Sequence, residues 1–144
     1  MLEMIIAAFL LTTFVVQLGA IWAAINRHWQ NLADRAAVDR EVRAVRALIL
    51  SDLVPASSVS VTSDRLQLHY TNPSLSDITY MPTGDGKSLV RMDVQGNYVI
   101  GAAKYLHSAQ CSLGGDGSLS ASWSFRKGTA SADLNLFQAF VSPS

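Results

Sequence analysis

The pattern of apolar and polar positions changes twice along the chain. No charged side chain occurs from Met4 to Ile25, so the first stretch is apolar on every side. From Asn31 to Leu53 there is neither glycine nor proline, and apolar residues recur at steps of three and four, which predicts an amphipathic helix. Its apolar stripe consists of Val38, Val42, Val45, Ile49 and Leu53. Beyond Pro55 apolar and polar residues alternate, which predicts strands.

These regions predict an α+β protein with a long N-terminal helix and a β-rich head. Pro55 ends the helix, because proline lacks an amide donor and disfavours the helical conformation of the preceding residue. An unbroken helix from Leu2 to Leu53 would be about 80 Å long, far longer than a bilayer requires. We therefore expect a transmembrane or filament-core helix over 1–26, its amphipathic continuation over 27–54, packed on a sheet, and a globular head over 55–144.

The apolar run is long enough to cross a hydrocarbon core of roughly 30 Å. A cleaved secretory signal would need a basic start and small residues before the cut, and neither flanks this run. A signal anchor stays open. Arg27, His28 and Arg35 would by themselves keep the C-terminal flank in the cytoplasm. A basic leader upstream of Met1, in the same reading frame, would reverse this orientation, and we expect one.

The alternating region predicts a mostly antiparallel sheet. In the segment 65–70, Leu66, Leu68 and Tyr70 share one face, and Trp123 and Phe125 share a face later in the chain. The expected strands are 57–61, 65–70, 77–81, 88–94, 98–102, 105–113, 118–125 and 134–141. They are separated by turn sequences with glycine or Asx residues, which are Asn72-Pro73, Gly84-Asp85-Gly86, Gly96-Asn97 and Gly114-Gly115-Asp116-Gly117.

Charge and cysteine content narrow the function classes. The 144 residues carry a formal net charge of +0, so the chain lacks the basic excess typical of nucleic-acid binding. The helix does carry an arginine row, but acids interleave with it, which favours a solvated face over a phosphate-binding stripe. The charged residues are Asp34, Arg35, Asp39, Arg40, Glu41, Arg43 and Arg46. Cys111 is the single cysteine and can form no internal disulfide.

The motifs that could carry chemistry are incomplete. Gly86-Lys87-Ser88 matches the end of a phosphate-binding loop, but Met81 stands where its first glycine belongs, which favours a hairpin turn. His107 and Cys111 lie four residues apart in a segment that alternates like a strand, with no second ligand pair. Asp85 and Asp116 lack the neighbouring carboxylates of a usual calcium site, and whether calcium binds stays open.

The sequence thus predicts no enzyme and no cofactor or metal site. One hydrolytic alternative stays open, because serines, aspartates and three histidines are present without a nucleophile-elbow sequence. A membrane-tethered hydrolase would depend on His69 or His107.

The first residues, Leu2-Glu3-Met4-Ile5-Ile6-Ala7, resemble the N-terminus of a type IV pilin or pseudopilin, where Thr-Leu-x-Glu precedes an apolar helix. In that family the glutamate is the fifth residue after leader cleavage and pairs with the N-terminal amine of a neighbouring subunit. Here only Met1 and Leu2 precede Glu3, so the resemblance implies a natural start further upstream. It also implies that Leu2, Glu3 and Met4 act in subunit assembly.

The later chain resembles the J-type minor pseudopilins of type II secretion, the W-type minor pilins and the competence pseudopilins. The resemblance lies in the order of a helix end, Arg46-Ala-Leu-Ile-Leu-Ser-Asp52-Leu53, then 66–70, Ile78-Thr-Tyr80 and Ser88-Leu-Val-Arg91. It does not separate secretion, pilus and DNA-uptake systems.

The resemblance implies a non-catalytic minor pilin or pseudopilin in the bacterial inner membrane, with one span and its head outside the cytoplasm. It would later join a periplasmic or surface filament. Its partners would be other pilins, a prepilin peptidase that also methylates the new N-terminus, and the assembly platform. Trp22 and Trp29 would mark the membrane interface, and Trp123 the sheet core. The alternative is a single-pass, signal-anchored envelope protein whose β-sheet domain binds a ligand or protein.

Overall fold

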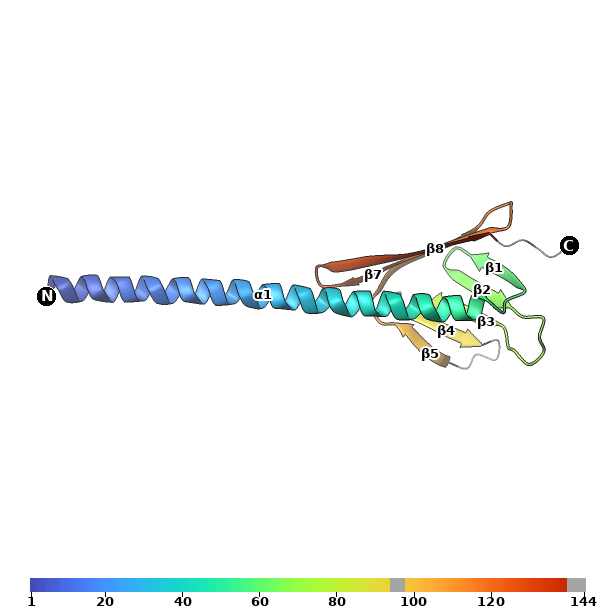
Figure 1. The fold of residues 1–144 in the computed structure, drawn as a ribbon, viewed down its shortest axis with the longest axis horizontal. Coiled ribbons are helices and arrows are strands. Elements are labelled where there is room, and N and C mark those ends of the chain that lie inside the picture. The colour runs from blue at the N-terminus through green and yellow to red at the C-terminus, as the bar shows by residue number, and fades with distance from the viewer. Residues whose placement is uncertain (94–97, 140–144) are drawn as a thin grey trace.

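Helix α1 is the longest element of the protein. The computed structural model describes residues 1–93 and 98–139 (Figure 1). Helix α1 runs unbroken over Leu2–Leu53, a length of 52 residues. Beyond it, the N–H of Val54 still donates to the carbonyl oxygen of Leu50 at 3.2 Å, and Pro55 then supplies no donor. Figure 1 shows the strands gathered around the C-terminal half of α1, with the N-terminus far from the head.

A five-stranded antiparallel sheet follows the helix. Its strands lie in the order β1-β2-β3-β4-β5, so each strand pairs with its successor in the chain. Their bounds are Ser58–Thr62 for β1, Arg65–His69 for β2, Ile78–Pro82 for β3, Leu89–Asp93 for β4 and Tyr98–Ala103 for β5. Leu66 and Leu68 of β2 are buried, as the alternation predicts, whereas Tyr70 lies just beyond the strand.

The head contains a second sheet that the sequence did not predict. Strands β6 (Leu106–Leu113), β7 (Ser118–Lys127) and β8 (Ala130–Ala139) form an antiparallel sheet in the order β6-β7-β8. The two sheets meet where the N–H of Cys111 donates to the carbonyl oxygen of Ser63 at 3.0 Å. Alternation shows which face of a strand is buried but not which strand lies beside it. The eight strands could therefore be predicted from the sequence, but their division between two sheets could not.

The core lies where α1 meets both sheets. Helix α1 contacts β5 of the first sheet and β7 and β8 of the second. Its stripe residues Val38, Val45, Ile49 and Leu53 are buried, and Val42 is half-buried against the same cluster. The largest fully buried side chains are Trp123, Tyr80, Phe125, Ile49, Leu66, Leu68, Leu89, Leu119, Val38 and Val45.

The expected turns at 84–86 and 114–117 are present, and the turn at Gly128 was not predicted. Gly86 and Gly117 adopt positive φ of 68° and 80° in two of the glycine turns. Strand β8 begins four residues before the predicted strand, because a tight turn at Gly128, with φ of 59°, follows Lys127 directly. The Gly96-Asn97 turn and the ends of the predicted strands 88–94 and 134–141 lie outside the described residues.

Candidate functional site

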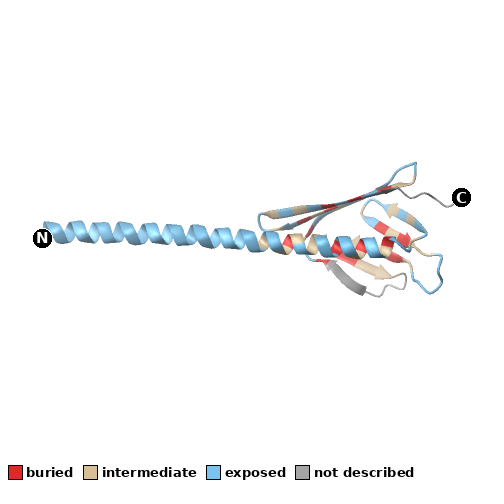
Figure 2. Cartoon of the chain, viewed as in Figure 1, coloured by how far each residue is buried: buried red, intermediate tan, exposed pale blue. Residues whose placement is uncertain are grey.

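Every residue of the N-terminal half of α1 is exposed (Figure 2), and most of these residues are apolar. By length and composition α1 can cross a membrane once. Because so large an exposed apolar surface is unusual for a soluble monomer, it marks a contact with lipid or with protein. We call it the apolar segment of α1; its large exposed residues are Leu2, Met4, Ile5, Ile6, Phe9, Leu10, Leu11, Phe14, Val15, Val16, Leu18, Ile21, Trp22 and Ile25.

Glu3 lies in the first turn of α1, at the free end of this segment. It makes no hydrogen bond or ion pair with the residues that the structure describes. Its neighbours Leu2 and Met4 are 72% and 78% exposed. A carboxylate is favourable at a helix N-terminus, where the unpaired N–H groups point outward. The three predicted assembly residues therefore present a negative charge on an apolar tip.

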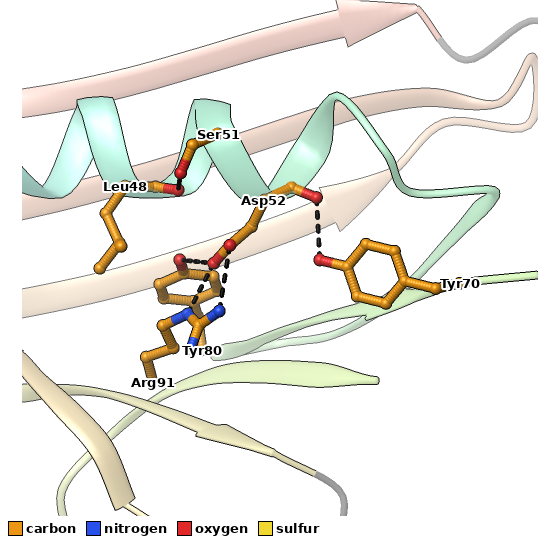
Figure 3. Close-up of polar contacts among 6 residues, drawn as sticks. All are labelled: Leu48, Ser51, Asp52, Tyr70, Tyr80 and Arg91. Atoms are coloured by element: carbon orange, nitrogen blue, oxygen red, sulfur yellow. Dashed lines mark hydrogen bonds and ion pairs between the residues drawn. The ribbon is translucent and has the colours of Figure 1, made fainter. Parts of the chain in front are cut away.

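The opposite end of α1 is fixed to the first sheet by a bidentate ion pair. Arg91 of β4 donates from Nε to Asp52 Oδ2 at 2.6 Å and from Nη2 to Oδ1 at 3.0 Å, as Figure 3 shows. The hydroxyl of Tyr80 on β3 also donates to Asp52 Oδ2, at 2.5 Å. The Arg91 and Asp52 side chains are only 14% and 13% exposed, so this pair is shielded from solvent far more than a surface pair.

A second tyrosine caps the backbone at the same place. Tyr70 donates its hydroxyl hydrogen to the carbonyl oxygen of Asp52 at 2.8 Å (Figure 3). That carbonyl belongs to the last turn of α1, where carbonyl oxygens lack an N–H partner within the helix itself. The Arg91 cation also lies beside the helix C-terminus, where positive charge is favourable. We call Asp52, Tyr70, Tyr80 and Arg91 the C-terminal latch.

The protonation states of the latch are fixed by burial and by Asp52. Burial, and then the hydrogen bond to Asp52, raise the pKa of Tyr80. Burial, and then the charge of Asp52, raise the pKa of Tyr70 to about 12. The hydrogen bond to Asp52 raises the pKa of Arg91 above its already high usual value. Both hydroxyls therefore stay protonated donors, so the latch is suited to holding α1 rather than to transferring protons.

The turn between β7 and β8 holds α1 at a second place. Lys127 Nζ lies 3.2 Å from Asp34 Oδ1, and the Thr129 hydroxyl donates to Asn31 Oδ1 at 3.1 Å. Gly128 sits between them, and an added Cβ would lie 2.9 Å from Asp34 Oδ2. We call these contacts the turn attachment. It meets α1 shortly after the apolar segment, so the turn attachment and the C-terminal latch lie at the two ends of the packed half of the helix.

A Ser-His-Asp chain lies on the first sheet. His69 Nδ1 is 2.6 Å from Asp77 Oδ2, and His69 Nε2 is 3.0 Å from the Ser60 hydroxyl. The Tyr70 N–H also donates to Asp77 Oδ1 at 3.1 Å, and these bonds, with the His69 contact foremost, lower the pKa of Asp77. The order of groups is that of a nucleophile, a base and an orienting acid. Ser60 is exposed on an edge strand, however, and the environment that makes such groups reactive excludes water.

The two aspartates considered as calcium ligands form hydrogen bonds within their own turns. Asp116 accepts from the N–H and the hydroxyl of Ser118, and Asp85 accepts from Thr83 and from the N–H of Lys87, which closes two hairpin turns. Burial raises the pKa of Cys111 to about 11, so its thiol is protonated at neutral pH. His107 lies on β6, and the described residues contain no cluster of three metal-ligating side chains.

Sequence reasoning missed the latch as an interaction. Asp52, Tyr80 and Arg91 all occur in the segments that carry the resemblance, yet no spacing along the chain reveals that they meet. The available signal was a carboxylate in the last turn of a helix, next to the buried stripe, and an arginine inside an apolar strand. A charge at the edge of a core needs an opposite charge nearby.

Comparison with known proteins adds no relative. No family model, no curated protein and no solved structure matches the chain.

Proposed function

We propose that the protein is a non-catalytic subunit of a type IV pilus-like filament, a minor pilin or pseudopilin. The observation that carries this proposal is the division of α1 into an apolar segment outside the head and a stripe packed inside it. A bilayer can cover the apolar segment of a single subunit, and neighbouring helices can cover it in a filament. The same surface would thus hold the subunit in the membrane and later pack against other subunits in the filament.

In this proposal the parts have separate tasks. The apolar segment holds the subunit in the inner membrane, with the head outside the cytoplasm, and then packs in the filament core. Glu3 neutralises the N-terminal amine of a neighbouring subunit, which is favourable because an ionised carboxylate is costly in apolar surroundings. The head presents surfaces to other pilins. A prepilin peptidase and an inner-membrane assembly platform are the implied helpers.

Replacement of Glu3 tests this proposal. We expect Glu3→Gln to accumulate in the membrane at the wild-type level but to disappear from the sheared filament fraction of native cells. Glu3→Asp, which keeps the carboxylate, should retain part of the assembly. Normal assembly of Glu3→Gln would contradict the proposal and favour the signal-anchored envelope protein, whose β-sheet domain binds its target without polymerising.

A membrane-tethered hydrolase is the second candidate, and the Ser60–His69–Asp77 chain is the observation that favours it. It predicts ester hydrolysis by the purified full chain, with the activity lost in both Ser60→Ala and His69→Gln while the fold is kept. Ser58→Ala, two residues earlier on the same strand, is the control. We expect no activity above buffer from any of these proteins; hydrolysis that depends on Ser60 but not on Ser58 would establish the enzyme.

A further inference from the structure

A polar pocket lies where α1 leaves the head. It has a volume of about 310 Å³ and is lined by Asn31 and Arg35 of α1, by Thr129 of the β7–β8 turn, and by Ala130 and Ser131 at the start of β8. It therefore includes one side of the turn attachment. The pocket is the first part of the head that a membrane would meet, because the apolar segment ends just before it.

The groups around the pocket favour an anion. Arg35 is exposed, and its guanidinium makes no hydrogen bond or ion pair within the described part of the chain. Asn31 already accepts from Thr129 through Oδ1, so its amide nitrogen remains as a donor. The carboxylate of Asp34, one residue before Arg35, is paired with Lys127, with Asp34 Oδ1 3.2 Å from Lys127 Nζ. The pocket thus offers free donors and a free cation, and none of its five lining residues carries a carboxylate.

The position along α1 fits the depth of lipid headgroups. Trp29 is 65% exposed, and tryptophan is enriched at the membrane interface. Arg35 lies six residues further, which is about 9 Å along the helix axis. Because helical side chains lean toward the helix N-terminus, we expect the Arg35 guanidinium to extend toward the bilayer. Arginine also matches phosphate geometry with two parallel hydrogen bonds.

We propose that this pocket binds the phosphate of an anionic phospholipid headgroup at the outer face of the membrane that holds α1. The proposal rests on the membrane stage of the proposed function and adds a specific lipid contact to it. The bound headgroup would set the depth of α1 and the angle of the head before assembly. Extraction into a filament would then have to break this contact.

The full-length protein in lipid nanodiscs tests the proposal. Discs of phosphatidylcholine with a minor share of phosphatidylglycerol are prepared, and native mass spectrometry measures which lipid the released protein retains. We expect the wild type to retain phosphatidylglycerol preferentially. Arg35→Gln should lower this preference about fivefold, the equivalent of roughly 1 kcal/mol per basic residue at an anionic surface. Arg46→Gln removes the same charge about 16 Å further along α1 and should leave the preference unchanged.

Three results would overturn the lipid site. They are equal retention by wild type and Arg35→Gln, an equal loss in Arg46→Gln, and displacement of phosphatidylglycerol by inorganic phosphate at similar concentration, which would indicate a site for a free anion. Failure of the chain to enter nanodiscs, measured by flotation, would remove the membrane stage and this proposal with it. Normal insertion without lipid preference would overturn the pocket alone, and the Glu3 experiment would still stand.

Discussion

The two halves of α1 share one unbroken helix but are stabilised in different ways. The C-terminal half buries Val38, Val45 and Ile49 against two sheets and is fixed at both ends by polar contacts. The N-terminal half buries none of its large apolar residues within the protein. Its helical form therefore gains nothing from the head and depends on lipid or on other chains. The comparison shows that helix continuity need not mean a shared structural role.

The largest expected difference in the free energy of unfolding comes from replacing one isoleucine by alanine in each half of α1. Ile49 is fully buried, and Ile21 is 56% exposed. We expect Ile49→Ala to lower the free energy of unfolding by about 2 to 5 kcal/mol through lost burial and a cavity. Ile21→Ala should change it by less than about 0.5 kcal/mol.

Unfolding of the full chain by guanidinium in a neutral detergent measures this difference. Trp123 is completely buried and reports on the head when Trp22 and Trp29 are replaced by phenylalanine. Similar losses from Ile49→Ala and Ile21→Ala would contradict the division of the helix.

The next largest loss of stability is expected at the C-terminal latch. Arg91→Met leaves the Asp52 carboxylate and the Tyr80 hydroxyl without their cation. We expect a loss of about 2 to 3 kcal/mol, somewhat less than for a fully buried pair, since the partners are slightly exposed. Arg65→Met is the control. Arg65 Nε lies 3.7 Å from Asp64 Oδ1, and the two side chains are 54% and 44% exposed. The loss of stability in this variant should therefore stay below about 1 kcal/mol. The same denaturation experiment would reject the latch if both variants behaved alike.

A smaller effect is expected at the turn attachment. Gly128 has φ of 59°, and a Cβ there would lie 2.9 Å from Asp34 Oδ2. Gly128→Ala should therefore cost about 1 to 2 kcal/mol, because an L-residue is strained at this φ. Gly84 has no atom within 4 Å of an added Cβ, and Gly84→Ala should be close to neutral. Equal thermal stability of the two variants would contradict the strained conformation of Gly128 in this turn.

The smallest expected effect is the pH dependence of stability that Asp77 causes. The folded-state pKa of Asp77 is lowered, first by the hydrogen bond with His69 and then by the Tyr70 N–H. Its contribution to stability is therefore present above the unfolded pKa of about 3.9 and is lost as the pH falls through the lowered folded value. We expect the difference in stability between wild type and Asp77→Asn to shrink as the pH falls below about 4. A difference that stays constant from neutral to acid pH would show that the Asp77 charge is not involved.

The helix was the part of the fold that the sequence could predict best. An uncharged run, a stripe with steps of three and four and Pro55 are local signals, and they give α1 its correct start and end. The strand positions were also local and were close to the observed bounds. The separation into two sheets depends on where the chain leaves Ala103 and begins again at Leu106, and no local pattern distinguishes this step from another hairpin.

The polar contacts were harder to predict for the same reason. Asp52 and Arg91 are 39 residues apart, and Asn31 and Thr129 are 98 apart, so only the folded chain brings them together. The Ser60–His69–Asp77 chain shows the opposite risk. Its residue types suggest catalysis, but its exposed position on an edge strand favours a structural hydrogen-bond chain.

In the proposed filament, the apolar segment of α1 contacts the same kind of segment in other subunits. A photo-crosslinking amino acid at Phe14, which is 58% exposed, tests this claim in native cells. We expect adducts with other helix-bearing subunits in the filament fraction, and their loss when Glu3→Gln is introduced. Adducts with lipid alone, unchanged by Glu3→Gln, would contradict assembly and leave α1 as a membrane anchor.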